Sequence, residues 1–355
     1  MPKTVTLMSS LLPYLPEFRQ GIQRRYEATY RKVAGHDPHH YGDGEPDPQL
    51  ERYQQNFVRH LGSYKRSASL EEVMRAARRS QVVYVGDFHP WRSAKDIFIK
   101  IVTEGASPGS QRIILLEEFQ PKHDKYLKAY LKGEITDTNG LRARTWAYDR
   151  NGTWGGVLAI VDYAEEQEIP VKGIDVRFYG GSLVPLPQRT KGIAAQVERY
   201  IHDGEQIFIL AGEFHLASNK LPAELGSKVK SSVTIFQGPD EMFWKLLPHG
   251  LAYGPDAVLT STGVYCLRNS NPLFRAMVQQ SAAFLRNDPE RSSKQNLEIE
   301  YKSHLINVVG RALRMRNIDT IKPDQVPLAD LERLVYGNDD KSVVRAKLKE
   351  WVSRG

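Results

Sequence analysis

Short apolar segments alternate with helical segments along most of the chain between Ser69 and Gln237. The apolar segments read VVYVG, RIILLEEF, IPVKGID and EQIFILAGEFH, and the helical ones SLEEVMRAARRS, SAKDIFIKIV, YAEEQ and KGIAAQVERYIHDG. Continuous apolar runs are typical of strands buried on both faces, and the intervening helices allow successive strands to run parallel. The pattern predicts an α/β fold with a largely parallel central sheet, flanked by helices and carrying helical N- and C-terminal additions.

A chain of 355 residues exceeds the usual size of one domain, so further regions are expected beside the sheet. We predict a helical N-terminal extension and linker over residues 1–68, the α/β domain over residues 69–245, and a mostly helical C-terminal extension over residues 246–355 that packs on the core. Both extensions contain segments with apolar residues at helical spacing. The N-terminal helix is expected to pack on the main domain, and the C-terminal helices on the main domain or on a second copy in a homodimer.

The N-terminal extension contains one clear helical signal and one loop signal. Phe18, Ile22, Tyr26 and Tyr30 are spaced four apart, which puts them on one face of a helix. Residues 36–48, HDPHHYGDGEPDP, are rich in Pro, Gly and Asp and predict a solvated loop.

Composition narrows the classes of function. The single cysteine, Cys266, leaves no internal disulfide and no cysteine zinc cluster, which fits a reducing compartment. The first apolar patch is broken by Pro13 and Pro16 and does not resemble a signal peptide. No run of about 18 apolar residues predicts a transmembrane helix. The expected location is therefore cytoplasmic. The net charge of +7 is spread thinly, so we expect no nucleic-acid partner.

Two strand segments far apart in the chain end in the same way, on glycine, an acid, phenylalanine and histidine. The first gives Asp87 and His89 after Gly86, and the second gives Glu213 and His215 after Gly212. Ligands of open α/β sheets bind beyond the carboxyl ends of the strands, where loops carry the chemistry. We therefore predict that both histidines face one polar crevice.

Two further strand ends add charged side chains. RIILLEEF ends on Glu117 and Glu118, and continued strand geometry would turn only one of them into the crevice. IPVKGID ends on Asp175. Clustered carboxylates require protons, a cation or a basic ligand, because like charges shift one another's pKa values. Arg189, just before a predicted helix, supplies part of that charge.

Motifs of several common enzyme classes are missing. The sequence contains no G-x-S-x-G elbow, no H-E-x-x-H, no Walker A loop and no dinucleotide fingerprint. The aromatic residues Trp146, Tyr148 and Trp154 either cover the sheet or stack on a flat ligand beside the crevice.

The order GDFH, LLEEFQ, WAYDRNGTWGG, YAEEQEIPVKGID, QRTKGIAAQV and LAGEFH resembles the ChaN family, part of a superfamily with Tiki proteases, TraB proteins and erythromycin esterases. The resemblance covers about Ser69 to Gln237. The positions that match the family motifs are Gly86, His89, Glu117, Arg189, Gly212 and His215. Two positions depart from the family pattern, because Asp87 stands where Glu is commoner and Thr190 stands where an acid commonly follows the arginine.

The resemblance implies two alternative functions. One is a hydrolase site for a small-molecule or peptide substrate, in which His89 or His215 activates water, Asp87 or Glu117 orients the histidine, and Arg189 stabilises negative charge. A divalent Mn²⁺ or Zn²⁺ ion would then be held by His89, His215, Glu117 and Glu213.

The other implied function is haem binding without catalysis, since ChaN is associated with haem and iron uptake. A histidine, Tyr148 or Tyr179 would then ligate the iron, and Trp146 or Trp154 would cover the ring. ChaN is a lipoprotein, whereas this sequence has no lipoprotein signal, which weakens an uptake role.

Overall fold

The computed structural model describes residues 17–34, 48–89, 92–145, 154–179, 182–202, 204–247, 251–252, 256–284, 294–315, 317–337 and 339–354. The chain forms two compact units. Unit 1 comprises residues 1–43, 238–255 and 268–355, and unit 2 comprises residues 44–237 and 256–267.

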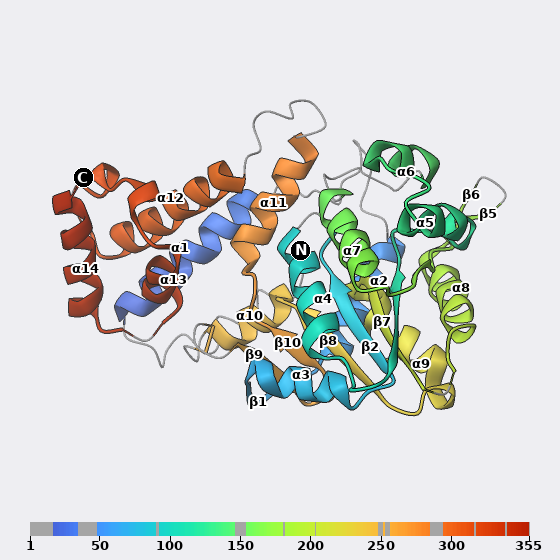
Figure 1. Cartoon of the computed structure of the whole chain (residues 1–355). Coiled ribbons are helices and arrows are strands. Elements are labelled where there is room, and N and C mark those ends of the chain that lie inside the picture. Colours follow the sequence, from blue (N-terminus) through green and yellow to red (C-terminus); the bar gives the residue numbers. More distant parts are fainter. Residues whose placement is uncertain are drawn as a thin grey trace. The chain divides into compact units, whose positions relative to one another are not determined.

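Unit 2 contains the sheet and the helices that cover it (Figure 1). Its strands are β1 (Tyr64–Ala68), β2 (Val82–Asp87), β3 (Gln111–Leu116), β4 (Val171–Gly173), β5 (Phe178–Tyr179), β6 (Ser182–Leu183), β7 (Glu205–Gly212), β8 (Ser232–Gln237), β9 (Ala257–Thr260) and β10 (Tyr265–Leu267). Its α-helices are α2 (Pro48–Leu61), α3 (Leu70–Arg78), α4 (Arg92–Glu104), α5 (Asp124–Leu131), α6 (Thr138–Thr145), α7 (Trp154–Glu166), α8 (Leu186–Glu198) and α9 (Leu221–Leu225). Three short 3₁₀ turns are η3 (Pro121–His123), η4 (Glu213–Leu216) and η5 (Gly226–Lys228).

The main sheet of the described residues has eight strands in the order β1-β9-β10-β8-β2-β7-β3-β4. The pairs from β10 through β8, β2, β7 and β3 to β4 are parallel, and only the β1–β9 and β9–β10 pairs are antiparallel. The predicted α/β fold with a largely parallel sheet is therefore confirmed. In this order β2, β7, β3 and β4 are neighbours, so their carboxyl ends lie at one edge.

Both faces of the central strands are buried, as their uninterrupted apolar sequences require. Val83, Val85, Phe208 and Leu210 pack in a core with residues of α3, α4 and α7, which lie over one face in Figure 1. The alternate residues of the same strands, such as Tyr84, point to the opposite face and are buried as well. Helix α3 is capped at its start, since Ser69 Oγ accepts a hydrogen bond from Glu72 N at 3.2 Å.

Unit 1 is helical in the part of the chain that the structure describes. Its helices are α1 (Glu17–Ala34), α10 (Asp240–Leu246), α11 (Pro272–Phe284), α12 (Lys294–Ala312), α13 (Leu328–Tyr336) and α14 (Lys341–Arg354), with 3₁₀ turns η8 (Ile318–Thr320) and η9 (Pro323–Gln325). The predicted apolar stripe of α1 is buried at Ile22 and Tyr26. The Tyr26 ring stacks edge-on against Tyr336, and its hydroxyl donates to Asn271 Oδ1 at 3.2 Å.

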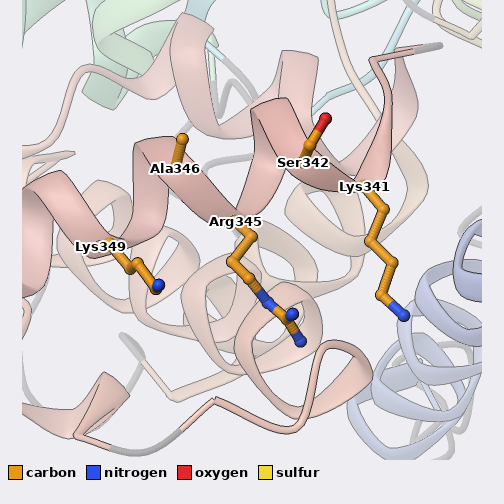
Figure 2. A pocket seen from close by; sticks show the side chains of 5 residues that line it. All are labelled: Lys341, Ser342, Arg345, Ala346 and Lys349. Atoms are coloured by element: carbon orange, nitrogen blue, oxygen red, sulfur yellow. The ribbon is translucent and has the colours of Figure 1, made fainter.

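The exposed side of α14 is basic. Lys341, Arg345 and Lys349 follow one another at four-residue spacing and, with Ser342 and Ala346, line a shallow hollow of about 540 Å³ (Figure 2). The hollow offers neither a carboxylate nor an imidazole among its lining residues. It therefore cannot perform the acid–base chemistry predicted for the strand ends.

The units do not follow the boundaries expected from the sequence. Strands β9 and β10 lie within the region expected to be a helical extension, yet they pair into the main sheet. Helix α1 groups with α11 and α12 in unit 1. The loop predicted over residues 36–48 lies outside the described residues except for its last position. No helix in the described part of the chain has the length and apolar character needed to cross a bilayer.

Candidate active site at the strand ends

The predicted site residues meet at the carboxyl edge of β2, β7, β3 and β4. Asp87 is the last residue of β2, Glu117 follows β3, and Gly212 ends β7. In-register pairing puts Asp87 opposite Gly212, and the Glu117 amide donates to Leu210 O at 3.1 Å. The sheet therefore fixes the spacing of three strand ends before any side chain interacts.

Around β2, a buried carboxylate is held by a lysine and a histidine. Lys95 Nζ on α4 donates to Asp87 Oδ1 at 2.7 Å and to Oδ2 at 2.9 Å. His89 Nδ1 lies 2.7 Å from Asp87 Oδ2. The same ammonium donates to the backbone oxygen of His89 at 2.8 Å, so the turn that carries the histidine is tied to the carboxylate that orients it.

Around β3, a second carboxylate is held by an arginine and a backbone amide. Arg189, at the start of α8, donates from Nη2 to Glu117 Oε1 and from Nε to Asp175 Oδ1, the latter at 2.7 Å. Gly212 N donates to Glu117 Oε2 at 2.5 Å. Both oxygens of Glu117 are therefore engaged, and Arg189 bridges the ends of β3 and β4.

The group around β2 and the group around β3 meet at Gly212. A Cβ placed on Gly212 would lie 3.4 Å from Glu117 Oε2 and 3.4 Å from His89 Nε2. His215 lies on the inner side, with Nδ1 2.8 Å from Thr190 Oγ1 and Nε2 3.5 Å from Glu117 Oε1. The two distant histidines thus approach the same glutamate.

Exposure separates the two histidines. The His89 side chain is 39% exposed, whereas that of His215 is 4% exposed and that of Arg189 is 8% exposed. Within this cluster, His89 is therefore the side chain that a ligand in solution can reach.

Charge pairing sets the protonation of the group around β2. Burial opposes ionisation of Asp87, but the Lys95 ammonium and the His89 ring hold the pKa of Asp87 well below its usual range. Burial favours a neutral His89, but the Asp87 hydrogen bond and charge raise the pKa of His89 to about 10. Burial and the neighbouring Asp87 charge raise the pKa of Glu118. At neutral pH Asp87 is therefore a carboxylate and His89 is an imidazolium.

In the group around β3, the carboxylate is ionised but the histidine is neutral. Burial opposes ionisation of Glu117, but Arg189 and the two histidines hold the pKa of Glu117 far below its usual range. Burial lowers the pKa of His215 to about 4, and the attraction of Glu117 does not overcome it. His215 is therefore neutral at neutral pH, and Glu117 is a carboxylate.

The expectation that only one of Glu117 and Glu118 faces the crevice was wrong. Strand β3 ends at Leu116, so the two glutamates lie in a turn and the strand alternation does not extend to them. Glu118 Oε1 lies 3.5 Å from His89 Nδ1, while Glu117 binds Arg189. Both carboxylates belong to the site.

The other predicted residues lie at the margin of the site or outside the described residues. Glu213 is buried in η4, and its Cγ would lie 2.9 Å from a Cβ on Gly86, so the first glycine makes room for the second motif. Trp154 is 9% exposed and stacks edge-on against Phe119, which places it in the core. Trp146 and Tyr148 lie outside the described residues, and for Tyr179 only the backbone is described.

Lys95 is the site residue that the sequence reasoning missed. It is fully buried, on the same face of α4 as Phe98 and Val102. A lysine within the apolar stripe of a helix that directly follows a strand-end acid is a signal that could have identified it.

The possible metal ligands differ from the predicted set of His89, His215, Glu117 and Glu213. Ligand atoms of Asp87, His89 and Glu118 lie within 4.8 Å of one another. Glu117 is instead bound to Arg189 and Gly212, and His215 to Thr190. Asp87, His89 and Glu118 therefore bring together the donors that a divalent ion prefers, although Lys95 already binds Asp87.

Comparison with known proteins gives one family match and three similar structures. ChaN of Campylobacter jejuni, solved in a study of cofacial haem binding, is 13% identical with a TM-score of 0.40, over 50% of this chain and 90% of that chain. The type III effector HopBA1 is 14% identical with a TM-score of 0.40, over 55% and 90%. The Pasteurella multocida toxin, whose C-terminal region has a thiol-protease like catalytic triad, is 14% identical with a TM-score of 0.34, over 60% and 26%.

No curated protein matches the sequence. Residues 73–178 match the family model described as haem-binding uptake, Tiki superfamily, ChaN. This segment runs from α3 through the first strand-end motif and both glutamates to β5. Residues 73–178 are therefore similar to the ChaN family of the Tiki superfamily, as the resemblance of the sequence predicted.

Proposed function

We propose that the strand-end cluster is the acid–base site of a hydrolase that cleaves an ester or peptide bond in a small molecule or peptide. The observation that carries the proposal is the His89–Asp87 pair. The ring is partly exposed and is fixed through Nδ1 by a fully buried carboxylate. A proton-transfer group oriented by a second, buried group is the arrangement that general acid–base catalysis requires.

The charge state of His89 suggests the direction of proton transfer. With its pKa raised to about 10 by Asp87, the ring carries a proton at neutral pH. His89 is therefore better suited to donate a proton from Nε2 to a leaving group than to act as the general base that the sequence suggested. Asp87 keeps the ring charged and oriented, and Arg189 orders Glu117 rather than contacting the substrate.

The test is a hydrolysis assay with alkyl esters, followed by acid release, and a panel of fluorogenic peptides, because the leaving groups of both need a proton. His89→Gln should lower kcat/KM by about 100-fold or more, since positioned proton transfer contributes roughly 10²–10⁴-fold. His304→Gln in α12 is the matched control, because His304 is 33% exposed and lies in unit 1. Equal rates for His89→Gln and wild type, or no hydrolysis by wild type of any substrate, would exclude the proposal.

The predicted Mn²⁺ or Zn²⁺ ion is tested in the same assay. Dialysis against a chelator, followed by addition of either ion, shows whether the rate depends on a metal. Loss of activity that only a divalent ion restores would support the metal; an unchanged rate would restrict the proposal to protein side chains.

Haem binding is the second candidate, favoured by the family model that residues 73–178 match and by the exposure of His89. With Nδ1 bound to a carboxylate, Nε2 is the nitrogen that would ligate iron after releasing its proton. Tyr148 and Tyr179 remain predicted alternatives. Adding haemin should then produce a shifted Soret band that His89→Gln removes. An identical spectrum for the variant would exclude His89 as the ligand.

A further inference from the structure

The Lys95 ammonium lies in a cage of oxygen atoms. It donates to Asp87 Oδ1 at 2.7 Å and Oδ2 at 2.9 Å, to His89 O at 2.8 Å and to Phe88 O at 3.4 Å. The lysine and aspartate side chains are both fully buried. Oxygen atoms converging on one buried point form the coordination shell of a cation, and here the cation is part of the chain.

The helix facing Lys95 is shaped for its aliphatic stem. A Cβ on Gly156 of α7 would lie 3.2 Å from Lys95 Cγ and 3.3 Å from Cδ. Gly156 thus leaves room for the lysine as it passes from α4 to the strand end. The fit involves α4, α7 and β2, so the ammonium is held in place by packing as well as by hydrogen bonds.

The same atoms would have to serve a metal. Among the described residues, the group suited to a divalent ion is Asp87, His89 and Glu118. Asp87 uses both oxygens for Lys95, and Oδ2 also bonds the ring nitrogen Nδ1 of His89. A divalent ion there would face a fixed positive charge beside its first ligand and would have to break the His89–Asp87 hydrogen bond.

We propose that Lys95 is the resident cation of this site: its ammonium takes the place of a divalent ion at Asp87 and fixes the Asp87–His89 pair. Lys95 is a positioning residue, because it touches Asp87 and the backbone of the His89 turn and not the solvent. The inference concerns the site of the proposed function but not its reaction, so the two can fail separately in a binding experiment.

The test is calorimetric titration of the full-length protein with Mn²⁺ at pH 7.5. Wild type should bind Mn²⁺ only weakly at this site. Lys95→Ala, which opens the oxygen cage, should bind it at least tenfold more tightly, and Lys95→Ala with Asp87→Asn should lose that gain. Lys100→Ala is the matched control on the same helix, because Lys100 is 43% exposed and pairs only with Glu104 among the interactions described. This control should bind Mn²⁺ as wild type does.

A second comparison does not depend on the folding of the lysine variant. In the wild-type background, Asp87→Asn should leave Mn²⁺ binding unchanged, because Asp87 is already occupied by Lys95. Tight Mn²⁺ binding by wild type that Asp87→Asn abolishes would overturn the proposal. So would a folded Lys95→Ala protein, checked by circular dichroism, that binds Mn²⁺ no better than wild type.

Discussion

At the scale of single residues, the site is a set of buried charges that compensate one another. Lys95 faces Asp87 and Arg189 faces Glu117 and Asp175, so Asp87 and Glu117 keep their charges within the fold, whereas burial raises the pKa of Asp175. Burying a charge is costly unless it is paired and hydrogen-bonded. The pairing leaves the His89 ring as the partly exposed group of the cluster, and that exposure supports the role proposed for it.

Gly212 offers a way to block this ring without disturbing the fold. Its backbone (φ −51°, ψ 135°) suits any residue, and a Cβ there would make ordinary contacts at 3.4 Å with His89 Nε2 and Glu117 Oε2. Gly212→Ala should therefore change the free energy of unfolding by less than about 1 kcal/mol. It should nevertheless lower hydrolysis by about tenfold, because the methyl group covers Nε2.

Urea unfolding and the hydrolysis assay measure the two effects separately. Gly21→Ala in α1 is the matched control, since a Cβ there would lie 3.9 Å from the Ala312 side chain. An unaltered rate for Gly212→Ala would mean that substrate does not approach His89 through Nε2.

His215 predicts a pH dependence of stability. Burial lowers the pKa of His215 to about 4 in the folded protein. As the pH falls below about 6.5, the unfolded chain therefore binds a proton at this histidine that the folded protein does not bind. The stabilisation that results from the lowered pKa of His215 is fully present above pH 6.5 and is lost between pH 6.5 and about 4. Comparing pH 7.5 with pH 4.5, wild type should lose about 2–3 kcal/mol more stability than His215→Gln.

Urea unfolding of both proteins at the two pH values measures this difference. His123 has a similarly lowered pKa but is present in both proteins, so its contribution cancels. Parallel losses of stability in wild type and His215→Gln would contradict the assignment of His215 as a neutral buried ring.

The sequence located most of the site but not its balancing charge. Asp87, His89, Glu117 and His215 could be found because each follows an apolar strand, and parallel strands bring such ends together. Lys95 could not be assigned from the strand pattern, since its burial depends on how α4 packs against α7 and β2. The depth of a helical lysine is a tertiary property, and periodicity reports only the face of the helix on which it lies.

At the scale of elements, four strands were predicted from their apolar segments, whereas β8, β9 and β10 were not. Strands β2, β3, β4 and β7 appear at the expected places because burial leaves a continuous apolar pattern in their segments. Strands β9 and β10 span only Ala257–Thr260 and Tyr265–Leu267, are joined by a turn with Gly263 at φ +82°, and lie in a region that we expected to be mostly helical. Their pairing is fixed by the edge of the sheet, which the local sequence does not encode.

One side chain joins three elements at the opposite end of the strands. Gln206 in β7 is 2% exposed, donates from Nε2 to Ala77 O and Gly105 O at 2.9 and 3.0 Å, and accepts from Ser107 N at 2.7 Å. Gln206→Leu would remove the amide partner of Gly105 O and Ser107 N, whereas Ala77 O would keep its bond from Ser80 N at 3.0 Å. We expect it to lower the free energy of unfolding by about 2–4 kcal/mol.

The measurement is chemical unfolding followed by circular dichroism. Gln111→Leu, on the exposed first residue of β3, makes the same substitution without burying a polar group and should change stability by less than about 0.5 kcal/mol. Similar midpoints for the two variants would show that the Gln206 amide does not hold these elements together.

At the scale of the whole molecule, the two units are interleaved along the chain and differ in charge. The chain passes between them near residues 43, 237, 255 and 267. Unit 1 contains 23 Lys and Arg residues against 17 Asp and Glu residues, so it carries +6 of the net charge of +7. The basic character of the protein is therefore a property of unit 1, with the exposed face of α14 as one part of it, and the unit that holds the site is almost neutral.

Interleaving predicts which fragments can fold. A fragment of residues 69–245 follows the sequence-based boundaries but lacks β1, β9 and β10, so β8 would become an unprotected edge strand of the sheet. A fragment of residues 44–267 keeps every strand and helix of unit 2, with α10 in a connecting segment. We expect the shorter fragment to aggregate or to melt about 10 °C or more below the longer one, because an exposed edge invites intermolecular pairing and several buried apolar side chains lose their partners. Size-exclusion chromatography and thermal melts compare the two fragments. A fragment of residues 69–245 that is monomeric and melts at the same temperature as the longer fragment would mean that the antiparallel edge contributes nothing to the stability of the sheet.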